Sequence, residues 1–153
     1  MNILHLYISP GHNYFGHHGR DPAAHPVCEV SRLHCLAGRG IEGDRFLDYK
    51  ANYKGQITFF AHDVYESLCR SLGVLDQSPG VLRRNVVTTG VDLNTLVGRS
   101  FELQDVQFEG IEECRPCSWM DRAFYPGAEE WLKWRGGLRA RILTDGWLRA
   151  PNA

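Results

Sequence analysis

The chain has 153 residues, the length of one ordinary domain, and we expect residues 1–153 to form a single domain. Its 43% hydrophobic and 23% charged residues are typical of a globular protein, which excludes a disordered polypeptide. The 17 basic and 18 acidic residues leave a formal net charge of −1, a balance that argues against a nucleic-acid-binding or membrane-surface protein.

Neither a membrane-spanning segment nor a signal peptide is recognisable. The apolar start of the chain, residues 1–8, is too short to cross a bilayer, and no basic run precedes it. We therefore expect a soluble, cytoplasmic protein with reduced thiols, any special one being reactive or metal-binding. The five cysteines are Cys28, Cys35, Cys69, Cys114 and Cys117.

The chain is expected to begin with a strand, followed by a long loop. Asn2–Ile8 is rich in Ile, Leu and Tyr, which predicts the strand, and imperfect alternation predicts another over residues 27–35. The segment between them, residues 9–26, is long enough to suggest a functional loop. A polar, exposed loop is favoured over a metal site, because adjacent histidines do not easily reach one ion. Four histidines lie in it: His12, His17, His18 and His25.

A glycine- and charge-rich segment at residues 38–53 precedes a predicted strand at 55–60. Residues 61–72 then predict a helix, because apolar side chains recur at helical spacing. Gly73 stands where a helix C-cap belongs. The apolar positions of this helix are Val64, Tyr65, Leu68 and Leu72.

The second half of the chain predicts more short strands. Residues 84–88 and Ser100–Leu103 favour strands, and 106–112 alternates without settling which face is buried. A short helix is expected at 126–135.

The last segment predicts a hairpin between residues 138–144 and 147–148, since Asp145 and Gly146 form a strong turn signal. Many short strands with two small helices indicate a mainly β domain of the α+β class, in the form of a distorted β-barrel.

Cys114 and Cys117 form a CxxC segment, in which backbone amides and Arg115 can stabilise a thiolate. Three interpretations stay open. A zinc site needs about four ligands, so Cys28, Cys35 or the loop histidines would have to complete it. A redox pair would favour a βαβ context, which is absent here. Two idle thiols are the remaining interpretation.

Basic residues recur beside glycines and at strand ends. Arg45 follows Gly43 in a loop, Arg83 and Arg84 precede a strand, and Arg139 and Arg141 share one face of another. If the arginines converge, they would bind a phosphate or carboxylate; otherwise they are solvated surface charges. We expect the two acidic pairs, Glu112–Glu113 and Glu129–Glu130, to be solvated. The tryptophans are expected to be packing residues: Trp119, Trp131, Trp134 and Trp147.

Taken together, five segments resemble the MOSC domain, named for the C-terminal domain of molybdenum cofactor sulfurase. They occur in the order of the family: residues 40–45, 82–86, 98–102, 114–117 and 136–141. The resemblance implies a short, free-standing MOSC-type distorted β-barrel that binds a molybdenum cofactor, a molybdopterin.

The resemblance also implies roles for individual residues. Cys117 corresponds to the cysteine that is the candidate molybdenum ligand or persulfide carrier, and thus the candidate catalytic residue. A thiolate suits a soft metal and leaves positions open for a substrate. Cys114 receives no role. The candidate cofactor-binding residues are Arg45, Arg84, Asn85, Arg115 and Arg139.

The leading hypothesis is a molybdenum-dependent oxidoreductase that reduces small N-hydroxylated compounds, as some members of the family do. Electrons would come from a separate donor protein, because no flavin or iron–sulfur motif is present. One alternative is a persulfide or cofactor carrier acting through Cys117, with a cysteine desulfurase as partner. The other is a zinc-binding or plain ligand-binding domain.

Overall fold

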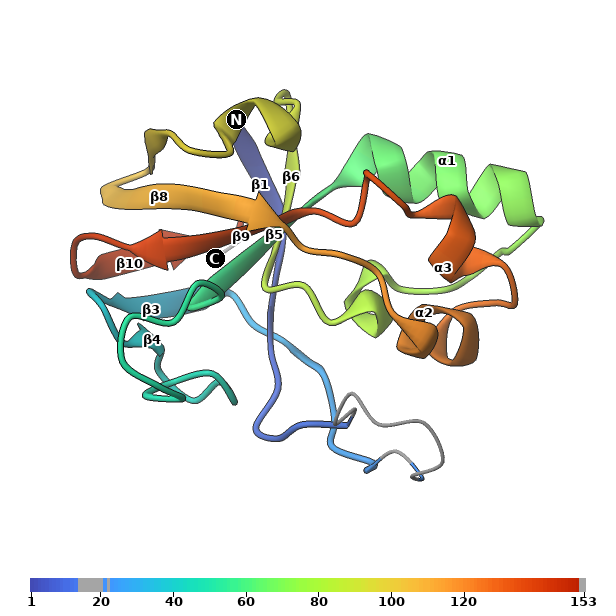
Figure 1. The fold of residues 1–153 in the computed structure, drawn as a ribbon, viewed down its shortest axis with the longest axis horizontal. Coiled ribbons are helices and arrows are strands. Elements are labelled where there is room, and N and C mark those ends of the chain that lie inside the picture. Colours follow the sequence, from blue (N-terminus) through green and yellow to red (C-terminus); the bar gives the residue numbers. More distant parts are fainter. Residues whose placement is uncertain (14–20, 22, 152–153) are drawn as a thin grey trace.

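The computed structural model describes residues 1–13, 21 and 23–151 (Figure 1). Ten strands are present in these residues: β1 (Asn2–Ile8), β2 (Cys28–Glu29), β3 (Arg32–Leu36), β4 (Gly40–Ile41), β5 (Ile57–Ala61), β6 (Val86–Thr89), β7 (Ser100–Leu103), β8 (Val106–Glu113), β9 (Leu138–Ile142) and β10 (Gly146–Arg149). The helices in the same residues are α1 (His62–Leu72), α2 (Ser118–Ala123) and α3 (Ala128–Trp131), with 3₁₀ turns η1 (Pro79–Leu82) and η2 (Leu93–Leu96).

The strands form two sheets. The larger has the order β2-β1-β6-β5-β9-β8-β7, and the smaller has the order β10-β3-β4. Within the described chain, β5 and β6 are the one parallel pair, and α1 belongs to the crossover that a parallel connection requires. In Figure 1 the sheets lie toward one side of the molecule and the three helices toward the other.

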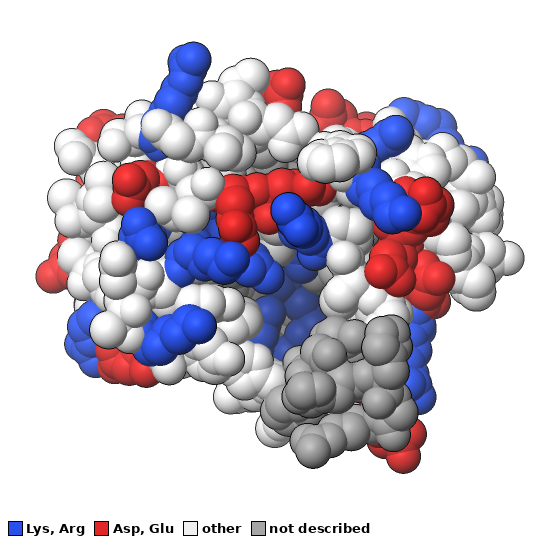
Figure 2. Space-filling model, viewed as in Figure 1, with Lys and Arg blue, Asp and Glu red and all other residues white. Residues whose placement is uncertain are grey.

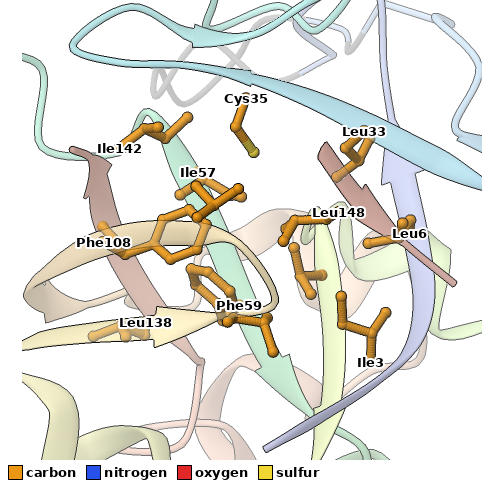
Figure 3. Packing of buried hydrophobic residues seen from close by; sticks show 14 of the residues in the cluster. Ile3, Leu6, Leu33, Cys35, Ile57, Phe59, Phe108, Leu138, Ile142 and Leu148 are labelled. Carbon is orange, nitrogen blue, oxygen red and sulfur yellow. The ribbon is translucent and has the colours of Figure 1, made fainter. Parts of the chain in front are cut away.

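The expected mainly β, α+β class is confirmed. The described strands do not close into a hydrogen-bonded barrel, because β2 and β7 remain at the edges of the larger sheet. The main core nevertheless draws side chains from both sheets, as Figure 3 shows. Phe59 and Phe108 of the larger sheet pack there with Leu33 and Leu148 of the smaller one.

A second core lies under the helices. Phe60 of β5 packs there with Leu68 of α1, Met120 of α2 and Leu132 beside α3. Phe59 and Phe60 are adjacent, so their side chains point to opposite faces of β5, and each enters a different core. β5 is therefore a central strand that is buried on both faces.

The predicted C-terminal hairpin is wrong. β10 pairs with β3, with Trp147 opposite His34, and does not pair with β9. The reason is that β9 already has β5 on one edge and β8 on the other. Asp145 instead accepts a hydrogen bond from the backbone N–H of Ala37, 2.7 Å away, so the turn connects the two sheets.

Other elements follow the sequence more closely. α1 ends where expected, at Gly73 in the left-handed conformation with φ 66°. The single strand expected at 27–35 is instead two short strands, β2 and β3. The helix expected at 126–135 is reduced to α3, and α2 was not expected. No helix in the described residues has the length and apolar character needed to cross a membrane.

Candidate functional site

The buried carboxylate of Asp44 connects three segments of the chain around the candidate site. The side chain of Asp44 is fully buried and accepts hydrogen bonds from the backbone N–H of Ser9 at 3.0 Å and of Phe46 at 3.2 Å. It also accepts from Nδ2 of Asn85 and pairs with Nη1 of Arg45, both at 3.3 Å. Asp44 thus fixes the loop after β4 against the end of β1 and sets the position of Arg45.

Asn85 lies behind the arginines. Its Oδ1 accepts from the backbone N–H of Thr58 at 3.0 Å and from the Thr58 hydroxyl at 2.9 Å. Its Nδ2 donates to the carbonyl of Tyr7 at 3.2 Å and to Asp44. Because both amide hydrogens are donated within the protein, Asn85 is placed to hold β1, β5 and the approach to β6 together.

Arg84 connects three backbone segments beneath the CxxC segment. Its guanidinium donates to the carbonyls of Gly136 at 3.0 Å, Leu82 at 3.0 Å and Cys114 at 3.2 Å. The residue is 8% exposed. Arg84 therefore holds the Cys114–Cys117 segment beside the double glycine that precedes β9.

Cys114 is buried and lies among cationic groups. Burial acts to lower the pKa of Arg139, but Cys114, and more weakly Tyr53 and Glu112, raise that pKa above its ordinary value. Burial lowers the pKa of Arg45, an effect that Asp44 opposes and Arg84 reinforces. The sequence assigned Cys114 no role, whereas the structure buries it and joins its carbonyl to Arg84.

Cys117 lies at the start of α2 and is partly buried. Burial raises the pKa of its thiol, while a hydrogen bond from the backbone of Trp119 and the charge of Arg84 act to lower it. Arg84 thus acts on both cysteines: it donates a hydrogen bond to the carbonyl of Cys114, and its positive charge acts to lower the pKa of the Cys117 thiol. Arg115, between the two cysteines, is exposed at the rim.

Glu112 belongs to a chain of charges rather than to a solvated pair. Its Oε1 lies 2.7 Å from Nζ of Lys54 and 3.2 Å from Nη1 of Arg139. Arg139 is therefore oriented by a carboxylate. Figure 2 shows Lys and Arg side chains gathered around a hollow on one face, with acidic side chains among them.

Arg83 also belongs to the buried arginines, although the sequence did not distinguish it from Arg84. It is 7% exposed and has a left-handed backbone, with φ 58°. Its Nη2 donates to Oγ of Ser9 and to the carbonyl of Gly11, each at 2.6 Å. Burial, followed by the charge of Arg45, lowers the pKa of Arg83 to about 10, and Asp44 opposes this. Two consecutive arginines before a strand were the only signal in the sequence.

The structure thus brings most of the expected site residues together. We refer to the two thiols and their arginines as the thiol–arginine site: Arg45, Arg84, Cys114, Cys117 and Arg139. No three His, Cys, Asp or Glu side chains within the described residues lie close enough to hold a metal ion by themselves. His12 packs edge-on against Phe46, while His17 and His18 lie outside the described residues.

Comparisons with known proteins agree with this architecture. A family model described as the MOSC domain matches residues 17–150. The structure of YuaD from Bacillus subtilis superposes with a TM-score of 0.75 at 16% identity, covering 97% of this chain and 90% of that one. YiiM from Geobacillus stearothermophilus superposes with a TM-score of 0.69 at 12% identity, covering 97% of this chain and 70% of that one. YiiM from Escherichia coli superposes with a TM-score of 0.64 at 16% identity, covering 94% of this chain and 66% of that one. A search of curated proteins finds no match.

The scaffold role of Asn85 is open to a direct test. We expect Asn85→Ala to lower the free energy of unfolding by about 3 kcal/mol, because it leaves several buried backbone and side-chain groups unpaired. Asn94→Ala is the control, since it removes an exposed hydrogen bond to the Trp134 carbonyl and should cost below about 1 kcal/mol. Equal losses in urea unfolding would contradict the scaffold role.

The crowding of buried guanidinium groups predicts stabilisation by anions. Inorganic phosphate should raise the melting temperature more than chloride at matched ionic strength, by about 2–4 °C for each kcal/mol of binding. Burial and the charge of Arg84 both disfavour the positive charge of Arg45, and a bound anion relieves both effects. Arg45→Gln removes that charge and should therefore remove the difference between phosphate and chloride. Arg39→Gln changes an exposed arginine paired with Asp48 and should leave the difference unchanged. A phosphate effect that survives in Arg45→Gln would contradict an anion site here.

Proposed function

Because this chain belongs to the MOSC domain family, which is known for binding the molybdenum cofactor, we propose that its thiol–arginine site holds that cofactor and reduces N-hydroxylated compounds. The observation that carries the proposal is that one side chain, Arg84, joins the arginine segment before β6 to the CxxC segment. Arg84 hydrogen-bonds the carbonyl of Cys114 and acts on the thiol of Cys117.

The residues present fit such a cofactor. A metal that arrives with a pterin dithiolene needs few ligands from the protein, and a thiolate is a soft ligand of the right kind. The thiol of Cys117 meets that need without a further cluster of ligands. Arginines suit the phosphate of the cofactor, because guanidinium groups bind phosphate oxygens in pairs. Arg45 and Arg139 are the arginines that we assign to this phosphate, because the charge state of each responds to Cys114 of the CxxC segment.

Each residue then has a distinct part. Cys117 provides the thiolate for the metal, and Arg45 and Arg139 bind the anionic and polar edges of the cofactor. Arg115, exposed at the rim, contacts whatever enters, while Asn85 positions the others from behind. When bound, the cofactor supplies a centre that exchanges two electrons.

The reaction needs two electrons and two protons, and yields an amine and water from an N-hydroxylated amine. A separate donor protein supplies the electrons in this proposal. Burial raises the pKa of the Tyr53 hydroxyl, even though Arg139 opposes the effect, so Tyr53 stays protonated at neutral pH.

A carrier of persulfide or of the cofactor is the second candidate. It is favoured by the partial exposure of Cys117, which leaves this thiol open to a donor such as a cysteine desulfurase. The zinc alternative has no ligand set to support it in the described part of the chain.

The first test measures molybdenum and pterin in protein purified from cells that make the cofactor. We expect both in the wild type, and less molybdenum in Cys117→Ser because the soft ligand is lost. Cys69→Ser is the matched control: Cys69 is partly exposed, as Cys117 is, but lies in α1. Molybdenum retained in full by Cys117→Ser, together with reduction of an N-hydroxylated amidine by a chemical electron donor, would contradict the role of this thiol.

The same preparation distinguishes the carrier. Incubation with a cysteine desulfurase and cysteine should then add one sulfur atom to the peptide that contains Cys117, as mass spectrometry detects. Under the oxidoreductase proposal, the wild type instead reduces the N-hydroxylated amidine with multiple turnovers, and Cys117→Ser does not.

A further inference from the structure

A cavity of about 520 Å³ lies beside Arg83, and the proposed function does not use it. Its size falls within the range of small-molecule pockets. The described residues that line it include neither cysteine of the CxxC segment, nor Arg45, nor Arg139. Arg83 also lines a small gap beside Arg45 and Arg84, so it separates the cavity from the thiol–arginine site.

Two fixed aromatic side chains form part of the cavity walls. The indole Nε1 of Trp119 donates to the carbonyl of Val81 at 3.1 Å, and the hydroxyl of Tyr7 lies 3.2 Å from Oγ of Ser78. Since both rings are held before anything binds, a planar apolar group would bind without the entropy cost of ordering them. Ala123, one turn of α2 beyond Trp119, leaves space on the same wall.

The cavity wall carries a buried positive charge. Arg83 is 7% exposed, and its three hydrogen bonds within the described residues go to neutral oxygens, those of Ser9, Gly11 and His25. A buried cation without a hydrogen-bonded counter-charge is costly, and an anion beside it reduces that cost. The depth and sign of this charge therefore favour a ligand with an anionic end.

The cavity wall also carries the opposite charge. Glu29 lines the same cavity, and its side chain is 56% exposed, far more than Arg83. Its carboxylate lies 2.7 Å from Nδ1 of His5 at the surface. A ligand in the cavity would thus find a buried cation and an exposed carboxylate among the groups that line it.

We propose that this cavity is a binding site for a planar aromatic carboxylate, with the carboxylate on Arg83 and the ring system beside Trp119 and Tyr7. An amino group at the far end of the ring system strengthens binding through Glu29. The site requires neither the cofactor nor a cysteine, so it stands or falls independently of the proposed function.

The test is calorimetric titration of the protein without cofactor. 2-Naphthoate should bind, 2-naphthamide should bind at least tenfold more weakly because it lacks the charge, and 6-amino-2-naphthoate should bind more tightly than 2-naphthoate. Ala123→Phe should weaken naphthoate binding at least tenfold by filling the cavity. Ala51→Phe, at an exposed alanine outside the cavity, should have no effect.

Variants of the charged residues separate their parts. Arg83→Lys keeps the charge but loses the fork of donors, and should reduce the preference for naphthoate over naphthamide; Glu29→Gln should remove the gain from the amino group. Arg83 also has backbone partners, so Arg83→Lys could fail to fold for reasons unrelated to binding. In that case the comparison of naphthoate with naphthamide, together with Ala123→Phe, still tests the binding site. Absence of naphthoate binding, equal binding of naphthoate and naphthamide, or unchanged binding in Ala123→Phe would overturn the proposal.

Discussion

The buried carboxylate of Asp44 is the constraint on which the arrangement of the site depends. It joins the loop after β4, the end of β1 and the residue before β6 through hydrogen bonds to Ser9, Phe46 and Asn85. It is also the negative charge paired with Arg45 in a region where several guanidinium groups are buried. Because a buried cation is costly without a nearby counter-charge, this carboxylate stabilises Arg45 in its buried position.

The fold explains why this network can be rigid. β5 has Phe59 in the main core and Phe60 in the helical core, so the strand that carries Thr58 is held from both faces. Thr58 in turn bonds Asn85, and Asn85 bonds Asp44. The polar network is thus attached to the most buried strand of the larger sheet. Cys114 directly follows β8, which pairs with β9, the neighbour of β5.

Local patterns in the sequence were sufficient for part of this picture. The helix α1 was predictable because its apolar spacing and Gly73 are both local, and the short edge strand β7 was expected with its observed bounds. The terminal hairpin was wrong because pairing depends on which edges are already occupied, and β9 has none free. Strong turn residues indicate that the chain turns, but they do not determine where the next strand pairs.

The site was predictable only as a set of residue types. Arg45, Arg84, Arg139 and Cys117 were recognised from the resemblance to a family, and the structure brings them together. The contacts that position them were missed, because pairs such as Arg84 with the carbonyl of Cys114, and Glu112 with Lys54, join residues far apart in the chain. Nothing local distinguishes a buried thiol among arginines from an idle one.

The central claim, that Cys117 provides the protein ligand of a cofactor held by these arginines, is tested most directly by X-ray absorption at the molybdenum edge. The account predicts that loaded Cys117→Ser has one sulfur neighbour fewer than the loaded wild type, and that Cys114→Ser has as many as the wild type. An unchanged sulfur count in Cys117→Ser, or a loss that follows Cys114 instead, would contradict it.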